Sequence, residues 1–187
     1  MRAWPTICAC LLLLGLMPAT AADLGSRKWT AVGNWEIWVD RTQGDSCYVM
    51  RSYERGAVFR IGFGRDASNG YVILANEKWK SLVVGSKYAI ELKFDNNPAW
   101  KGNATARKAG NITYLHMDFG GQGLLKEFGH SDNASVTYKG QLAANVRLTG
   151  SDTAVEELMR CQATPSRALA PSDSQQRSAP DSDPFAR

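Results

Sequence analysis

The stretch YAIELKFD (residues 88–95) decides the fold class, because large apolar side chains alternate in it with small or charged ones. In an extended chain this alternation gives one apolar face, made of Tyr88, Ile90, Leu92 and Phe94. A period of two is the signature of a β-strand with one buried face. We therefore predict β-structure here and follow the same pattern outward along the chain.

Segments with strand character recur on both sides of this stretch. They are WEIWVD (35–40), CYVMRSYE (47–54), AVFRIGFG (57–64), YVILAN (71–76), WKGNATARK (100–108), NITYLHMDF (111–119), SVTYKG (135–140) and LAANVRLTG (142–150). Turn residues separate them, so that 48–63 and 100–119 are each predicted to form a β-hairpin.

Two segments depart from this period. GQGLLKEFGHSD (121–132) has its large apolar residues at helical spacing, and LTGSDTAVEELMRC (148–161) contains an amphipathic stripe. Thr153 and Glu156 match a capping box at the start of the second helix, with Ser151 as an alternative N-cap. We predict a mainly β fold, an antiparallel β-sandwich or curled barrel, with one or two short helices and the C-terminal helix packed on the sheet.

The ends of the chain differ in composition from the middle. Residues 1–22 combine Arg2, an apolar run of about 11 residues and small residues at a cleavage point, which predicts a secretory signal peptide. Residues 23–163 form the predicted single domain. Residues 164–187 are rich in Pro and Ser and predict a disordered tail. The apolar run is shorter than the roughly 20 residues that a spanning helix needs, so we expect a periplasmic or secreted protein that does not span the membrane.

The cysteines support the same compartment. Removal of the signal would take Cys8 and Cys10 with it and leave Cys47 and Cys161. An even count in an exported chain favours one disulfide, and two unpaired buried thiols are the alternative. A Cys47–Cys161 bond would fasten the last helix to a strand near the start of the domain.

Charge and motifs exclude several function classes. The formal net charge of +4 is small for a nucleic-acid-binding protein. His116 and Asp118 lie on one face of a predicted strand and are the candidate residues of a hydrolase, but the chain has no nucleophile signature beside them. No cofactor motif and no metal-ligand spacing stands out. We therefore expect no catalytic, cofactor or metal site.

Two tryptophans are candidates for partner binding. Trp38 points away from its apolar neighbours Ile37 and Val39 on one strand, and Trp29 precedes that strand. Exposed aromatic rings anchor protein partners and stack on sugars, whereas core packing is the commoner role.

GNWEIWVD and SCYVM, with the ending VRLTGSDTAVEELMRC, resemble the invasion-associated locus B family of small exported proteobacterial proteins. The resemblance covers residues 33–63 and 142–162. It implies a periplasmic or secreted β-sandwich, linked in some members to host-cell invasion. The family commonly carries a further cysteine in its first strand, where this sequence has Trp38 or Asp40. The resemblance supplies no catalytic residue.

Three functional hypotheses follow. The first is a non-enzymatic exported protein that acts by surface contacts with an envelope component or with a host or partner protein. The second is a periplasmic inhibitor or immunity protein against a lysozyme-like or protease enzyme, acting through a loop such as 64–70 or 95–103. The third is a hydrolase with a site near His116 and Asp118. The sequence determines neither the ligand nor the oligomeric state.

Overall fold

The structure, a computed structural model, describes residues 25–65 and 67–164. The predicted signal peptide and nearly all of the predicted tail lie outside these residues. The described part contains ten β-strands, two α-helices and two 3₁₀ turns. In chain order they are β1 (Ser26–Val32), β2 (Trp35–Asp40), η1 (Arg41–Gln43), β3 (Ser46–Tyr53), η2 (Glu54–Gly56), β4 (Ala57–Phe63), β5 (Asn69–Ala75), β6 (Lys87–Phe94), β7 (Trp100–Ala109), β8 (Ile112–Gly120), α1 (Gly123–Gly129), β9 (Asn133–Tyr138), β10 (Gln141–Arg147) and α2 (Ser151–Ala163).

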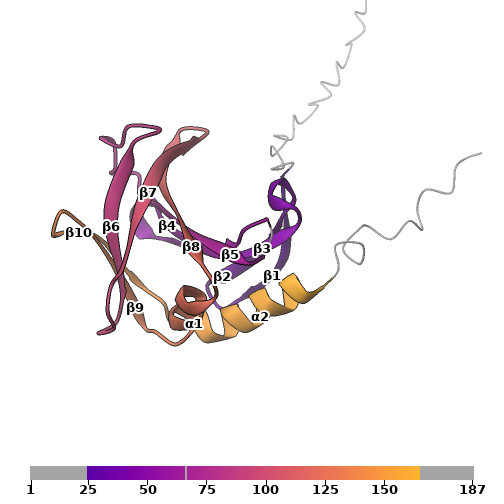
Figure 1. The fold of residues 1–187 in the computed structure, drawn as a ribbon. Helices are drawn as coiled ribbons and strands as arrows, with labels where there is room; N and C mark the ends of the chain where they lie inside the picture. The colour runs from indigo at the N-terminus through magenta and orange to yellow at the C-terminus, as the bar shows by residue number, and fades with distance from the viewer. Residues whose placement is uncertain (1–24, 66, 165–187) are drawn as a thin grey trace, which may run out of the picture.

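All ten strands belong to one antiparallel sheet with the order β1-β2-β3-β4-β5-β8-β7-β6-β9-β10. The sheet does not close, because β1 pairs only with β2 and β10 only with β9. It curls so that β6, β7, β9 and β10 turn towards β1 to β5 across the interior (Figure 1). The predicted mainly β fold with two helices is therefore confirmed.

The first strand, β1, was missed by the sequence prediction. Its pairing with β2 shifts register between Lys28 and Thr30, so Trp29 is an extra residue in the ladder. A bulge of this kind breaks the alternation that identifies a strand. As a result the ring of Trp29 packs against the core.

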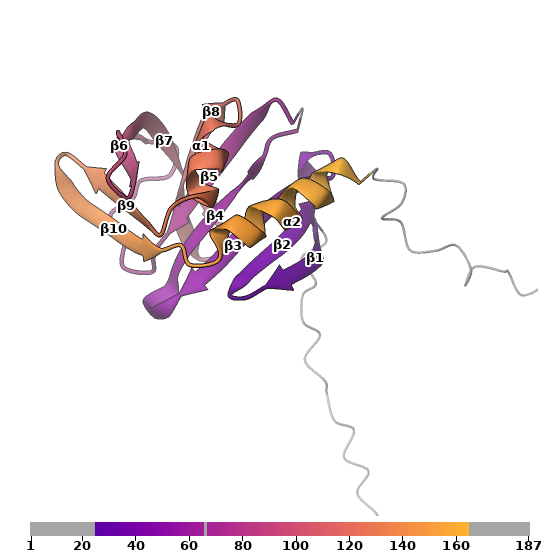
Figure 2. The same cartoon turned by 90° about the horizontal axis from the view of Figure 1, so that it is seen from below.

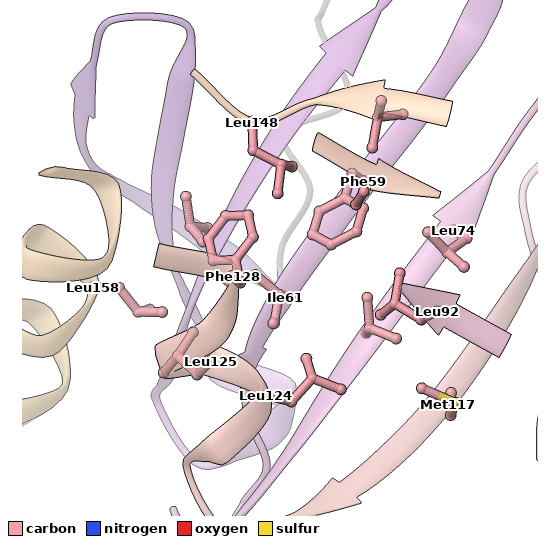
Figure 3. Packing of buried hydrophobic residues seen from close by; sticks show 14 of the residues in the cluster. Phe59, Ile61, Leu74, Leu92, Met117, Leu124, Leu125, Phe128, Leu148 and Leu158 are labelled. Carbon is pink, nitrogen blue, oxygen red and sulfur yellow. The ribbon is translucent and has the colours of Figure 1, made fainter. Parts of the chain in front are cut away.

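Aromatic rings from distant segments form the centre of the core. Phe59 on β4 and Phe128 on α1 stack with their centroids 5.5 Å apart, and Trp35 meets Phe128 edge to face at 5.2 Å. All three side chains are fully buried. Leu124, Leu125 and Phe128 of α1 point into this cluster, so the helix supplies core residues between the two halves of the sheet (Figure 3).

Helix α2 crosses β1, β2 and β3 beside α1 (Figure 2). It buries Ala154, Leu158 and Cys161, and Cys161 forms the predicted disulfide with Cys47 on β3, with 6.1 Å between the Cα atoms. Gln162 adds a second tether, because its Oε1 accepts a hydrogen bond of 2.8 Å from the backbone N–H of Cys47. The end of α2 is therefore attached to the inner face of β3.

The predicted capping box at the start of α2 is wrong. The helix begins at Ser151, directly after Gly150 in the left-handed conformation, and the backbone N–H of Ala154 already bonds to the carbonyl of Gly150. Thr153 therefore lies inside the first turn, where its hydroxyl contacts Asp152. The Ser151 hydroxyl does not cap the helix either, since it donates to the carbonyl of Ser131.

Side chains close the seam between the last strand and the first half of the sheet. The carbonyl of Arg147, at the end of β10, accepts hydrogen bonds from the Tyr53 hydroxyl at 2.7 Å and from Arg51 at 3.3 Å. The indole N–H of Trp35 donates to the carbonyl of Thr149 at 3.0 Å. Backbone carbonyls that lack a neighbouring strand thus obtain partners, which fixes the curl of the sheet.

Candidate functional site

The outer face of the sheet, opposite α2, carries a group of polar side chains that we call the outer-face cluster. Its members are Asp40, Tyr48, Arg60, Tyr71, His116 and Asp118, contributed by β2, β3, β4, β5 and β8. Tyr48 and Tyr71 are each only 4% exposed although they do not belong to the main core. Polar residues that are buried on the outside of a sheet need an explanation beyond packing.

Arg60 is the centre of this cluster. Its Nη2 donates to Oδ2 of Asp40 at 2.6 Å, and its Nε donates to the hydroxyl of Tyr71 at 2.8 Å. The guanidinium carbon lies 3.4 Å from the ring centroid of Tyr48 and 5.1 Å from that of Tyr71. Arg60 therefore combines an ion pair with cation–π contacts to two rings.

The register of the strands brings these groups together. Tyr48 lies opposite Gly62, and Gly62 lies opposite Tyr71, so a glycine separates the two tyrosines across the sheet. A Cβ atom at Gly62 would lie 2.5 Å from Cβ of Tyr48 and 2.7 Å from the carbonyl of Cys47. Only glycine leaves enough room for this approach. Asp40 is held as well, because its Oδ1 accepts from the backbone N–H of Thr42 at 2.9 Å.

The predicted pair of His116 and Asp118 belongs to the same cluster. Nε2 of His116 lies 2.9 Å from Oδ1 of Asp118, and the imidazole stacks on the ring of Tyr71 with 5.2 Å between centroids and 14° between planes. The His116 side chain is 10% exposed and that of Asp118 is 74% exposed. The histidine is therefore sheltered, with its partner at the solvent boundary.

Burial lowers the pKa of His116 below its ordinary value of 6.5. The hydrogen bond to Asp118 acts in the opposite direction, and the positive charges of Arg107 and Arg60 add to the lowering. The imidazole is consequently neutral at neutral pH. Burial likewise raises the pKa of the Tyr71 phenol, which keeps its proton.

A cavity of about 210 Å³ opens over this cluster, and we call it the outer-face cavity. Its floor and walls come from β1 and the residue before it, β2, η1, β4, β5, β7 and β8. The lining residues are Gly25, Ser26, Asp40, Thr42, Gln43, Arg60, Tyr71, Ile73, Arg107, Tyr114 and His116. Hydrogen-bonding and charged groups dominate this lining. Convergent polar groups in a concave site fix the orientation of a bound ligand.

Two of the larger hollows lie away from this cluster. A groove of about 450 Å³ between α1 and α2 is lined mainly by aliphatic groups and by exposed polar side chains such as Lys126 and Glu156. A wide hollow of about 960 Å³ lies at the seam between β3 and β10. Burial raises the pKa of Tyr53 there to about 12, and the nearby charge of Arg51 acts against this. Since the Tyr53 hydroxyl bonds to the carbonyl of Arg147, it serves the fold.

The two candidate tryptophans occupy different environments. Trp38 is half-buried on the outer face, next to Tyr48 across the β2–β3 ladder, and its indole N–H donates to Glu36 at 3.3 Å. Lys28 lies 5.7 Å from its ring centroid. Trp38 therefore borders the outer-face cluster, whereas Trp29 packs against the core.

The chemistry available at His116 is limited by its neighbours. Within residues 25–65 and 67–164, its side chain hydrogen-bonds to Asp118 and to no hydroxyl or thiol. In the same part of the chain, no group of three or more His, Cys, Asp or Glu residues is placed to hold a metal ion. The described helices include none that is long and apolar enough to cross a membrane. The hydrogen-bond partner of the His116 imidazole in this part of the chain is thus a carboxylate.

Sequence reasoning identified the His116–Asp118 pair but missed Arg60 and Tyr71 as parts of the same site. The available signal was the period of two, which already places Arg60 on the side of β4 opposite Phe59 and Ile61. Which residues become neighbours depends on the register between strands, and that information is absent from a single strand's pattern.

The fold and the site together describe an open, curled antiparallel sheet with a C-terminal helix joined to it by a disulfide and a polar cavity on its outer face. No protein-family model and no curated protein matches the chain. The fold is similar to the crystal structure of invasion associated protein B from Bartonella henselae, with a TM-score of 0.50 and 16% sequence identity, over 73% of this chain and 98% of that one. The similarity concerns the fold.

Proposed function

We propose that this chain is a non-enzymatic exported protein, periplasmic or secreted, that binds an envelope component or a partner protein through its outer face. The similarity to invasion associated protein B extends the proposal to a role in the contact between a bacterium and its host. The observation that carries the proposal is the outer-face cavity over the buried Arg60–Asp40 pair.

The disulfide supports the export part of the proposal. Cys47 and Cys161 are 114 residues apart in sequence, and both are 1% exposed. Disulfides of this structural kind form and persist in oxidising compartments such as the periplasm. The signal-like residues 1–22 agree with the same destination.

The organisation of the outer face supports the binding part. The ion pair with Asp40 and the contacts with the rings of Tyr48 and Tyr71 hold Arg60 in place before any ligand arrives, and Arg60 in turn bonds to the Tyr71 hydroxyl. A preorganised site loses little conformational freedom on binding. Arg107 and Tyr114 line the same cavity.

The test compares two charge-reversal variants of one strand. Arg107→Glu changes the outer-face cavity, and Lys108→Glu makes the same change at the next residue of β7, which points to the other face of the strand. Purified protein and both variants are immobilised and exposed to envelope extract, and the retained components are identified by mass spectrometry. We expect a component that Arg107→Glu loses and Lys108→Glu keeps. The same retained set for all three proteins would contradict binding through this face.

A second arm tests the compartment. The tagged full chain is expressed in a Gram-negative bacterium and the periplasm is released by osmotic shock. We expect the processed protein in that fraction, with a gel mobility that changes when it is reduced. A protein that stays in the cytoplasm at its full length would contradict export.

A hydrolase is the second candidate function, favoured by the 2.9 Å contact between His116 and Asp118 at the cavity. Its test is His116→Ala, which should abolish a hydrolytic activity and leave the melting temperature nearly unchanged. An active His116→Ala protein would eliminate this candidate.

The inhibitor hypothesis has one supporting feature, the turn after β6. Both carboxylate oxygens of Asp95 accept backbone N–H groups, from Asp132 at 3.0 Å and Asn133 at 2.9 Å. The turn is thereby held in one conformation, as an inhibitory loop requires. Replacing residues 96–99 by glycine and serine should abolish inhibition of the target enzyme without unfolding the protein. Retained inhibition would contradict this role.

A further inference from the structure

The charged groups that line the outer-face cavity are two arginines, Arg60 and Arg107, and one carboxylate. Asp40 is the carboxylate in its lining, and it is already occupied by Arg60 at 2.6 Å and by the backbone and hydroxyl of Thr42. Its charge is therefore matched before a ligand arrives.

Two hydrogen-bond donors come from Arg60 and Tyr71. The Tyr71 hydroxyl accepts hydrogen bonds from both Nε and Nη2 of Arg60, so its own proton remains available to donate. Because Arg60 uses Nε and Nη2 for Tyr71 and Asp40, Nη1 is the remaining donor of its guanidinium among the described residues.

Arg107 supplies a positive charge that no carboxylate of the cavity matches. It lies on β7 opposite Tyr114 of β8, it is exposed, and it has no ion-pair partner among the described residues. Its charge acts on His116 together with that of Arg60. The lining thus combines two guanidinium groups with one matched carboxylate. Asp118 lies beside the lining, 2.9 Å from His116 and 74% exposed to solvent, so the unmatched charge inside the lining is that of Arg107.

We propose that the outer-face cavity binds a small oxyanion, a carboxylate or phosphate group, between Arg107, Nη1 of Arg60 and the Tyr71 hydroxyl. This inference rests on the proposed function, because it names the chemical group through which that face would recognise a ligand. Charge-assisted hydrogen bonds from arginine to oxyanions are the strong and geometrically selective kind. The volume of about 210 Å³ admits such a group of a few heavy atoms.

Binding of an oxyanion is coupled to the protonation of His116. The groups that face this imidazole are Asp118 on β8, Arg107 on β7, Arg60 on β4 and Tyr71 on β5, with Tyr114 and Asp40 further along the cavity. A bound anion screens the two arginines, which favours the imidazolium and raises the pKa of His116 toward 6.5. Affinity therefore increases as the pH falls through the interval between the pKa values of the free and bound protein.

The experiment follows the two histidines of the domain by NMR. The purified, disulfide-bonded protein, isotope-labelled, is titrated from pH 8 to pH 5 in sodium chloride, and then in sodium acetate or sodium phosphate of equal ionic strength. His130 is the internal control, because it follows the last residue of α1, does not line the outer-face cavity, and has its Nδ1 2.7 Å from the carbonyl of Lys126, which accepts its hydrogen bond. We expect acetate, phosphate or both to raise the pKa of His116 saturably and to leave His130 unchanged.

The variants locate the effect. Arg107→Gln should raise the anion concentration that gives half of the His116 pKa change by about tenfold. This is the effect expected for the loss of a charge-assisted pair. Lys108→Gln, the matched control, should behave as the wild type. A response to phosphate alone assigns a phosphate ligand, and a response to acetate alone assigns a carboxylate.

Two results would overturn the inference: no saturable change at His116 with either anion, or equal responses of the Arg107→Gln and Lys108→Gln proteins. Either result leaves the proposed function standing if the envelope component retained by the wild type is still lost in Arg107→Glu. In that case the outer face binds its partner without an oxyanion.

Discussion

Removal of the Cys47–Cys161 disulfide should lower the free energy of unfolding by about 4 kcal/mol. The bond closes a loop with a sequence separation of 114 residues. In the chain-entropy model, a loop of that length restricts the unfolded chain by about 5 kcal/mol, and measured effects are commonly somewhat smaller. The corresponding decrease in the melting temperature is roughly 10–15 °C for a domain of this size.

The double variant Cys47→Ala/Cys161→Ala should nevertheless fold. Ala154 and Leu158 remain fully buried contacts of α2, and Gln162 still accepts from the backbone of residue 47. The helix therefore keeps its position while the unfolded chain gains freedom. Since a chain without the cross-link expands further, the dependence of the unfolding free energy on urea should also become steeper.

The assay is urea unfolding followed by far-UV circular dichroism, with oxidised wild type, the double variant and Gln162→Ala measured side by side. Gln162→Ala is the control for a local effect, because it removes one hydrogen bond at the same helix end and should cost about 1 kcal/mol. A double variant within about 1 kcal/mol of the wild type, with an unchanged urea dependence, would refute the loop-entropy reasoning.

Three further predictions concern the outer face. Gly62→Ala places a methyl group 2.5 Å from Cβ of Tyr48, so we expect a loss of about 2–3 kcal/mol in chemical denaturation, and a stable variant would show that β3 and β4 can separate. Arg60→Met leaves the charge of Asp40 buried without its partner and should cost about 3 kcal/mol; the added variant Asp40→Asn should recover part of this loss, and a further loss would contradict the ion pair. Since burial lowers the pKa of His116 in the folded protein, the unfolded chain binds its proton first, and stability should fall as the pH drops below about 6.5. Thermal unfolding between pH 8 and pH 5 measures this dependence, and His116→Asn should make it less steep. An equal slope in both proteins would contradict the prediction.

The alternation of side chains was sufficient to predict most of the sheet. Nine of the ten strands were predicted, most of them from this period, because a strand with one buried face places apolar residues at every second position; β5 was predicted from a continuous apolar run. The hairpin of β7 and β8 was predicted from its turn, where Gly110 has a φ of +56°. The exception is β1, in which the bulge at Trp29 interrupts the period.

The pairing of cysteines was equally accessible. With two cysteines left after the predicted signal, Cys47 and Cys161 have only each other within the chain. The start of α2 was harder to predict from the sequence, because Ser151 and Thr153 are both good N-cap residues. The turn at Gly150 determines where the helix begins.

The outer-face cluster shows what the sequence by itself determines and what it leaves to the tertiary structure. It determined that this chain forms an antiparallel sheet with a C-terminal helix, since burial of apolar side chains imposes a local period that can be read in one dimension. Only the tertiary structure decided that Arg60 meets Asp40, Tyr71 and His116, because the order of the strands and their register are set by the packing of the opposite, buried face. The local pattern specifies which side of a strand a residue occupies, and the assembled sheet specifies its neighbours.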